Sequence, residues 1–457
     1  MFFTRVMMFV GTLFMASVAA SETPLTDFHS DIRQLIQSDA AAHAVFISRA
    51  GKPVFQHAQG FANLELSVKA HVDTVFEIGS ITKQFTAVAI LSLAQQNKLS
   101  LTDPITKFIP GVQSNYKTPT IHHLLAHTSG MVDAINTPEY LKYRIQEPIS
   151  LLELIDSHKS SGWQFEPGER VNYTNVGYSM LAYVIEQASG QAYIDYLTTQ
   201  FFKPLNMLGS SQASKRIVSG KATGYTFNGE VLRQKDLLNL SWAYGAGDLL
   251  STVEDLNKWM TALMSGKLLN AYYFQVFNQG IQLNDGQKLN RGLSFDNTSV
   301  DGRRVYRMNG STLGFSSHTL YMPEQQLFIA VLNNSDGVNG GGWVAPATIS
   351  SKLLSSYLQL QGPDFVVIEQ ENIQIKNLVG KYRLEDGSVR QLTFENEQFF
   401  YQRNDGPKFQ VLPMADNSFF FSDTLSYFKI GNLRDKKKYM DFYYFPDNQA
   451  ERALSIN

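Results

Sequence analysis

The order of apolar and polar positions predicts strands near both ends of residues 40–360 and helices between them. Apolar runs at 44–48 and 53–56 flank Arg49-Ala-Gly-Lys52 and are typical of a β-hairpin. A longer apolar stretch, 80–97, has the length and spacing of a helix. The same patterns predict further helices at 27–37, 120–127, 150–158, 175–189 and 345–358, and strands at 74–78, 305–307, 316–321 and 327–332. Strands at both ends favour one antiparallel sheet completed by distant segments, with flanking helices and a helical region.

Residues beyond 361 have a different sequence pattern, in which short aromatic runs are separated by turn-forming residues. These runs follow Gln361-Gly-Pro-Asp364, which has the composition of a linker, and fall at 398–401, 418–421, 426–429 and 441–445. Short strands at this spacing are typical of a small all-β barrel or sandwich with an aromatic core. The sequence therefore predicts an α+β fold in two domains, 21–361 and 362–457.

The first twenty residues predict an export signal. A positively charged start, with Arg5, is followed by a short apolar core at 6–15 and then by the small residues 16–20. That core is too short to span a bilayer, and no cysteine near the cut site offers an attachment point for lipid. We therefore expect residues 1–20 to be removed, the mature protein to be periplasmic or secreted, and no stable membrane anchor to remain.

Composition narrows the possible partners. The 457-residue chain has no cysteine, a formal net charge of −2 and 44% hydrophobic residues, so disulfides and thiolate chemistry are excluded. Its one basic run, 434–438, is short and turn-like, so nucleic acid is not an expected partner. No motif indicates a cofactor, and the oligomeric state is left open.

Two other kinds of hydrolytic site are not indicated. His123 and His127 have the i, i+4 spacing of zinc ligands, but the glutamate of a His-Glu-x-x-His motif is missing, so no metal is expected. We expect His127 to brace the turn at 128–130. An α/β-hydrolase is disfavoured because the sequence contains no Gly-x-Ser-x-Gly.

The strongest chemical signal is a serine and a lysine three residues apart at the start of the 80–97 helix. Ser80 and Lys83 would share the first turn and one face. Lysine, with a usual pKa of about 10.4, can activate a serine only if burial or a nearby positive charge keeps the amine neutral. Ser-x-x-Lys recurs at Ser114, in a polar loop, and at Ser426, in a strand-like run. Ser80 alone follows a strand-like segment through a glycine into a helix, so we predict that it is the nucleophile.

A second candidate pair lies just before the 175–189 helix. Tyr173 and Asn175 form the only Tyr-x-Asn in the chain. The phenol of Tyr173 can exchange a proton with an attacking or leaving group, and the amide of Asn175 can orient Lys83 or a substrate carbonyl. A packed tyrosine followed by an N-cap asparagine is the structural alternative.

With both pairs in place, the chain resembles the serine β-lactamase and penicillin-binding-protein superfamily, in particular its class C β-lactamase, D-alanyl-D-alanine carboxypeptidase and esterase branch. The likeness is carried by Phe76-Glu-Ile-Gly-Ser80-Ile-Thr-Lys83-Gln-Phe-Thr86, Ile121-His-His-Leu-Leu-Ala-His127-Thr-Ser-Gly130 and Tyr173-Thr-Asn175-Val-Gly177-Tyr178. It implies a β-lactamase-like domain and an acyl-enzyme at Ser80, with Lys83 and Tyr173 sharing the proton transfers and Asn175 assisting. The final aromatic region resembles the lipocalin-like domain of some members.

The resemblance also implies a third site element, at Met308-Asn309-Gly310-Ser311. The family has lysine or histidine where this chain has Met308, which cannot bind a substrate carboxylate. Gly310 still permits close approach of the backbone, and the Ser311 N–H would join that of Ser80 as an oxyanion donor. Lactam antibiotics and peptides ending in D-alanine carry a carboxylate, so strong activity on them is less expected.

Together these features predict an exported serine hydrolase that acts on a small ester, lactam or peptide, as an esterase, a D-amino-acid peptidase or a weak β-lactamase. The alternative is a non-catalytic relative that binds cell-wall peptide or assembles with itself. Met308 favours the alternative. The presence of Ser80, Lys83, Tyr173 and Asn175 together favours the enzyme.

Overall fold

The computed structural model describes residues 28, 30, 32, 36, 41–112, 116–133, 145–159, 162–213, 217–227, 232–235, 238–336, 345–360, 377–384, 388–395, 397–404, 408–414, 418–421, 426–433, 437–443 and 450–456. The predicted signal at 1–20, the linker at 361–364 and Ser114 lie outside the described residues. The boundary between the two predicted domains therefore remains a prediction. No helix in the described part is long and apolar enough to cross a membrane.

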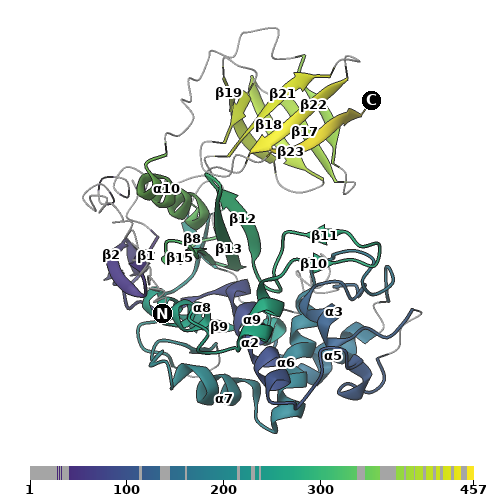
Figure 1. Cartoon of the computed structure of the whole chain (residues 1–457). Coiled ribbons are helices and arrows are strands. Elements are labelled where there is room, and N and C mark those ends of the chain that lie inside the picture. The colour runs from purple at the N-terminus through teal and green to yellow at the C-terminus, as the bar shows by residue number, and fades with distance from the viewer. Residues whose placement is uncertain are drawn as a thin grey trace, which may run out of the picture.

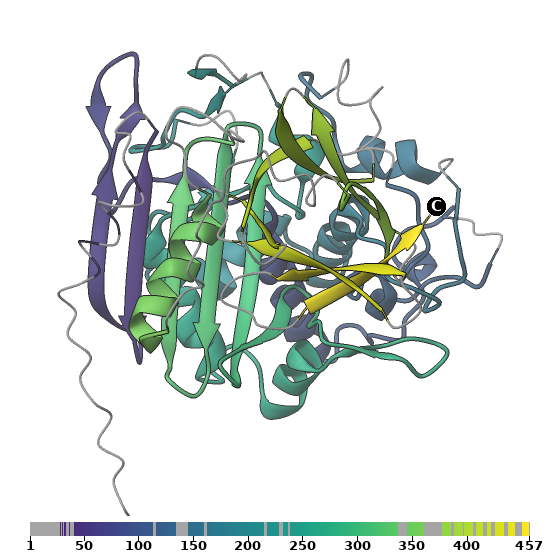
Figure 2. The same cartoon turned by 90° about the horizontal axis from the view of Figure 1, so that it is seen from above.

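A six-stranded antiparallel sheet forms the centre of the first domain (Figures 1 and 2). Its order is β12 (Asp296–Val300), β13 (Arg303–Thr312), β14 (Phe315–Met322), β15 (Leu327–Asn333), β1 (His43–Arg49) and β2 (Lys52–Gln59). Strand β15 pairs with β1, for example Val331 with Val45, so strands from both ends of the domain complete one sheet. The predicted antiparallel sheet is confirmed.

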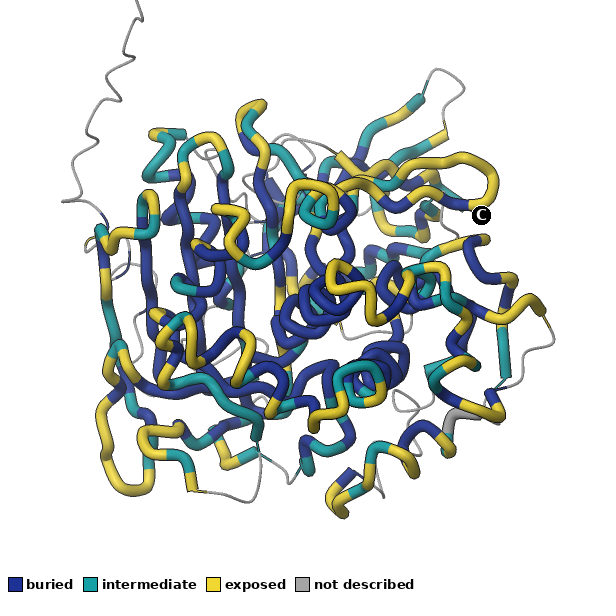
Figure 3. The backbone as a smooth tube through the Cα atoms, turned by 60° about the horizontal axis from the view of Figure 1, so that its bottom comes forward, coloured by how far each residue is buried: buried dark blue, intermediate teal, exposed yellow. Residues whose placement is uncertain are grey.

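Both faces of the sheet are covered, as the alternation along β1 requires. Val45 and Ile47 pack into a cluster with Ile349 of α10 (Pro346–Leu358) and with Phe28. Ala44 and Phe46 point to the other face and join the larger core, which includes α8 (Val253–Met264). Because successive side chains point to opposite faces, the apolar residues of β1 contribute to the packing on both faces of the sheet, with α10 on one face and α8 on the other. Figure 3 shows this buried interior.

Helix α2 (Thr82–Gln95) runs through the middle of the helical region, and 13 of its 14 residues are buried. Phe85 stacks on Trp259 of α8 with ring centres 4.0 Å apart. The surrounding helices are α3 (Ile121–Leu125), α5 (Leu151–Lys159), α6 (Asn175–Ser189), α7 (Tyr193–Leu197) and α9 (Ala271–Asn278). The helices predicted at 80–97, 120–127, 150–158, 175–189 and 345–358 are therefore present, with α6 at the expected bounds. The helix predicted at 27–37 lies mostly outside the described residues.

Three boundaries differ from the prediction for local reasons. Ser80 lies in a 3₁₀ turn, Gly79–Ile81, before α2 rather than inside the α-helix. Helix α3 ends at Leu125 because His127 adopts φ +57°, a left-handed conformation that ends a helix. The strand expected at 74–78 is only β5 (Phe76–Glu77), since the chain turns into the 3₁₀ segment directly afterwards.

Short strands complete the first domain. They are β3 (Phe61–Asn63) with β4 (Val68–Lys69), β6 (Ser211–Gln212) with β5 and β9 (Leu249–Ser251), β7 (Tyr225–Phe227) with β8 (Leu232–Gln234), and β10 (Ile281–Gln282) with β11 (Lys288–Leu289). The pairing of β5 with β9 matters for the site, because it fixes the start of α2 beside the residues that precede β9.

The C-terminal region is a closed eight-stranded antiparallel barrel, as the aromatic runs predict. Its strands are β16 (Gly380–Arg383), β17 (Val389–Glu395), β18 (Gln398–Arg403), β19 (Lys408–Pro413), β20 (Ser418–Phe420), β21 (Tyr427–Asn432), β22 (Lys438–Tyr443) and β23 (Ala450–Ile456). Aromatic side chains fill the interior, among them Phe399, Phe419 and Phe428. Closure leaves no unpaired sheet edge.

Replacing Phe85 by alanine should lower the free energy of unfolding by about 3–5 kcal/mol, because it empties the space between α2 and α8. The matched control is Leu208→Ala, at a side chain 85% exposed, which should change stability by less than about 0.5 kcal/mol. Urea denaturation monitored by tryptophan fluorescence measures both. Equal stability of the two variants would contradict the central place given to α2.

Candidate active site

The 3₁₀ turn that carries Ser80 lies directly against strand β13. Gly79 has φ +52°, and a Cβ built on it would lie 2.5 Å from the backbone nitrogen of Ser311. A Cβ on Gly310 would lie 2.0 Å from the carbonyl oxygen of Ile78. Both glycines are therefore needed for the backbones to approach this closely. Ser80 therefore lies directly before the first residue of α2, and the backbone of β13 packs against the turn that carries it.

Lys83 is almost fully buried, with 1% of its surface exposed, and three oxygen atoms lie within 3.3 Å of its amine nitrogen. Its Nζ donates to Oδ1 of Asn175 at 2.9 Å and to the carbonyl oxygen of Ala246 at 2.8 Å. The third neighbour is Oγ of Ser80, 3.3 Å away. A neutral amine has two N–H groups and one lone pair. Since the first two neighbours are acceptors only, the lone pair of a neutral Lys83 is left for the hydroxyl of Ser80.

Burial is the main cause that lowers the pKa of Lys83 below its usual 10.5. Tyr173 and Asp133 act in the opposite direction, and the positive charge of Arg291 lowers the pKa further. The surroundings therefore favour the uncharged amine, which can accept a proton.

Tyr173 completes the contacts of Ser80. Its hydroxyl donates to Oγ of Ser80 at 2.8 Å, and Nζ of Lys83 lies 4.7 Å from the centre of its ring. The ring stacks on His127 at 4.5 Å, and Nδ1 of His127 accepts the backbone N–H of Thr174 at 3.2 Å. Burial keeps the pKa of His127 well below 6.5, so the ring is neutral and Nδ1 can accept. His127 thus braces the loop that carries Tyr173.

Asn175 is the first residue of α6, and the N-cap residue is Thr174, so the N-cap alternative for Asn175 does not hold. Its backbone N–H donates to the carboxylate of Asp133 at 2.7 Å, while its side chain accepts from Lys83. Asp133 therefore fixes the start of α6, which in turn holds the amide against the amine.

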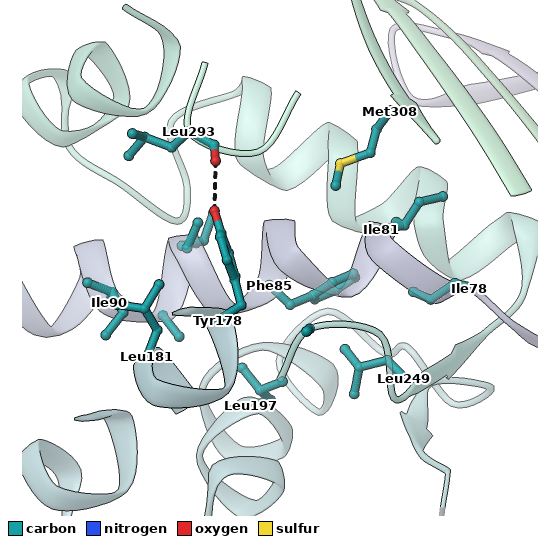
Figure 4. Packing of buried hydrophobic residues seen from close by; sticks show 14 of the residues in the cluster. Ile78, Ile81, Phe85, Ile90, Tyr178, Leu181, Leu197, Leu249, Leu293 and Met308 are labelled. Carbon is teal, nitrogen blue, oxygen red and sulfur yellow. Dashed lines mark hydrogen bonds between the residues drawn. The ribbon is translucent and has the colours of Figure 1, made fainter. Parts of the chain in front are cut away.

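The predicted third element is divided between the two faces of β13. Met308 is 8% exposed and belongs to the core cluster with Ile81 and Phe85 (Figure 4). Asn309 lines a cavity between the sheet and the barrel together with Arg307, so both face away from Met308. Ser80, Lys83, Tyr173 and Asn175 form one hydrogen-bonded group, and this cavity is not part of it.

A family model described as beta-lactamase matches residues 28–349, more than half of the chain. The chain belongs to the beta-lactamase family. It is 24% identical to penicillin-binding protein 4* of Bacillus subtilis over 82% of this chain and 87% of that protein. Membership places it among the hydrolases of the serine β-lactamase and penicillin-binding-protein superfamily.

Two solved structures share the fold of this beta-lactamase-family chain. The octameric penicillin-binding protein homologue from Pyrococcus abyssi has a TM-score of 0.67 at 22% identity, over 94% of this chain and 100% of that one. A D-stereospecific amidohydrolase from Streptomyces has a TM-score of 0.62 at 22% identity, over 72% and 97%. The first match extends across the barrel as well.

Three further groups lie at the site of this beta-lactamase-family protein that its sequence motifs did not indicate. The carbonyl of Ala246 has no signature, because every residue has such a group. Asp133 follows the Thr-Ser-Gly turn by three residues, and its carboxylate is a weak signal at best. Arg291 lies 118 positions beyond Tyr173 in sequence, yet its Cζ is 6.0 Å from the centre of the Tyr173 ring.

The pH dependence of Ser80 labelling should report the ionisation of Lys83. Neutral amine is scarce below its pKa and dominant above it, so the rate of labelling by a fluorophosphonate should rise with pH and level off below pH 10.5. Lys83→Arg should lower the rate at least about 100-fold at every pH, because a guanidinium stays protonated.

Lys235→Arg is the matched control for that substitution. Lys235 is also largely buried, but it is ion-paired with Glu77 at 2.8 Å, and arginine preserves the positive charge. This variant should keep both the rate and its pH profile. Full labelling of Lys83→Arg would overturn the role of Lys83 as proton acceptor.

Proposed function

We propose that this protein is an exported serine hydrolase that forms an acyl-enzyme at Ser80, with Lys83 and Tyr173 as its acid–base pair and Asn175 orienting the amine. The observation that carries the proposal is the arrangement of hydrogen-bond partners around the amine of Lys83. Two acceptor-only groups, Oδ1 of Asn175 and the carbonyl of Ala246, take the two N–H groups of a neutral amine. The remaining lone pair then faces the hydroxyl of Ser80.

In the proposed reaction, Oγ of Ser80 attacks the substrate carbonyl while its proton moves to Nζ of Lys83. The negative charge on the carbonyl oxygen is met by the backbone N–H groups of Ser80 and Ser311. Tyr173 gives its phenolic proton to the leaving atom and recovers one from Lys83 as the carbon–heteroatom bond breaks. Water then attacks the acyl-enzyme by the reverse set of proton transfers, which releases the acid and restores Ser80.

The substrate class we propose is a small ester or amide whose acyl part is uncharged. Met308 presents an apolar surface beside Ile81 where a cation would hold a carboxylate. Turnover of lactams should accordingly be weak. The fold shared with a D-stereospecific amidohydrolase makes N-acylated D-amino-acid amides, whose acyl part is uncharged, a further class of compound to test.

The rival function, a non-catalytic protein that binds cell-wall peptide or assembles with itself, has Met308 as its support. It does not explain why Lys83 is buried at the expense of its hydration, since a binding site does not need an uncharged amine. Export rests on the residue pattern of the first twenty positions.

Ser80→Ala separates the two functions. Wild-type protein should react with a fluorophosphonate probe and hydrolyse p-nitrophenyl acetate and butyrate faster than nitrocefin or a peptide ending in D-Ala-D-Ala. Ser80→Ala should lose the adduct and at least about 1000-fold in turnover, as removal of a nucleophile does. The exposed control Ser265→Ala should behave as wild type.

Intact mass and peptide mapping locate the adduct. Absence of any adduct in wild-type protein, or an equal adduct in Ser80→Ala, would support the non-catalytic function instead.

A further inference from the structure

A cavity of about 1180 Å³ lies between the central sheet and one end of the barrel, and the proposed reaction does not use it. Strands β12, β13 and β14 and helix α10 line it on one side, and barrel strands line it on the other. Figure 1 shows β12 and β13 on the side of the first domain that faces the barrel. Small ligands often bind between domains, and this cavity is as large as the pockets that hold them.

The sheet face beneath the cavity is polar, although the same face is apolar elsewhere. On β13, Val305 packs in the apolar cluster with α10, whereas Arg307 and Asn309, which point to the same face, line the cavity. Asp296 on β12 lies directly across from Arg307, and His318 on β14 lies directly across from Asn309. Opposite side chains have Cβ atoms about 5 Å apart, so Asp296, Arg307, Asn309 and His318 form one polar strip.

His318 supplies a hydrogen-bond acceptor to the polar strip. Burial and the positive charge of Arg307 lower its pKa to about 3, so the ring is neutral. The hydroxyl of Ser350 donates to the carbonyl of Ala347 at 3.0 Å, and its oxygen lies 2.6 Å from Nδ1 of His318. Because that hydroxyl has one proton, Nδ1 donates to it and Nε2 keeps its lone pair. Arg307 only donates, and the amide of Asn309 does both, so the strip offers donors and acceptors side by side.

The charges around the cavity balance. The described residues that line it include the arginines Arg304, Arg307 and Arg403 and the carboxylates Asp296, Glu324 and Glu451. Two of the carboxylates face an arginine directly: Asp296 lies across from Arg307, and Glu451 is bonded to the fully buried Arg390 of the barrel. A charged ligand therefore meets both signs. An uncharged ligand with several hydroxyl groups can use donors and acceptors at once.

The barrel supplies an aromatic wall across from the polar strip. Tyr401, Phe421 and Phe442 line the cavity at one end of the barrel interior. The ring centres of Phe421 and Phe442 are 5.5 Å apart, and that of Tyr401 is 5.1 Å from Phe421. A sugar ring has hydroxyl groups at its edge and C–H groups on its face, and the C–H groups pack on aromatic rings. The two walls match these two surfaces.

We propose that the cavity between the sheet and the barrel binds a saccharide, with hydroxyl groups on the polar strip and a ring face on the barrel aromatics. This binding site goes beyond the proposed function and does not depend on it. Met308, between Arg307 and Asn309 on β13, packs in the core with Ile81, so the strip lies on the opposite face of β13 from the Ser80 turn. A purely apolar ligand would leave the polar strip desolvated without partners.

Three trisaccharides that differ in linkage or substituents test the proposal on the full chain: cellotriose, triacetylchitotriose and maltotriose. At least one should bind with a dissociation constant in the millimolar range or tighter, as measured by calorimetry and saturation-transfer difference NMR. Arg307→Met should weaken that binding about tenfold, because it removes a charge-assisted donor at similar length. His318→Phe should weaken it too, since it removes the acceptor. Absence of binding by all three would overturn the proposal.

Arg303→Met is the matched control. Arg303 lies on the same strand, is 39% exposed and pairs with Asp301, and it is not among the residues that line the cavity. This variant should bind the trisaccharide as wild type does. Urea denaturation shows whether each variant is folded. Equal weakening in folded Arg303→Met and Arg307→Met would overturn the assignment to the polar strip.

Labelling of Ser80 separates this site from the candidate active site. Protein labelled with a fluorophosphonate, and Ser80→Ala, should bind the trisaccharide as tightly as unlabelled wild type. Loss of binding on labelling would place the sugar at Ser80 and overturn the proposal, whereas failure of wild type to label would count against the proposed hydrolase alone. Trialanine is the competing ligand. Tighter binding of trialanine than of every saccharide, weakened by Arg307→Met, would assign the cavity to peptides and overturn the proposal.

Discussion

The burial of one amine is the constraint on which the site depends. Lys83 belongs to a helix with no exposed face, and its Nζ is removed from water at a substantial cost in solvation. That cost is reduced when the amine is neutral and its two N–H groups are both bonded, as they are to Asn175 and Ala246. The interior that stabilises the fold therefore also shifts the pKa of Lys83 in the direction that the proposed chemistry requires.

The same constraint explains why so many distant segments meet at the start of α2. The β5–β9 pairing brings the Ala246 carbonyl to the amine, and the bond from Asp133 to the start of α6 brings the amide of Asn175. Strand β13 approaches from the opposite side, which is possible because Gly79 and Gly310 have no Cβ. Ala246, Asn175 and Asp133 all lie far from Ser80 in sequence.

Charge at the site is arranged differently from what the family resemblance implies. An apolar Met308 stands on β13, while Arg291 follows β11 and has its Cζ 6.0 Å from the centre of the Tyr173 ring. The cation beside Tyr173 therefore belongs to a different element from the one that carries the cation in the family.

The sequence by itself determined five of the helices, the antiparallel sheet, the aromatic barrel and the spacing of Ser80 with Lys83, but it did not indicate α7, α8 or α9. These follow from periodicity and from local geometry, which act over a few residues. It missed the 3₁₀ turn at Ser80 and the early end of α3, because single backbone angles such as that of His127 are not encoded in periodicity. Only the tertiary structure decided that Ala246, Asp133 and Arg291 lie at the site. A backbone carbonyl has no signature, and the place of a lone charged residue at the site depends on residues far away in the chain, as with Arg291 and Tyr173.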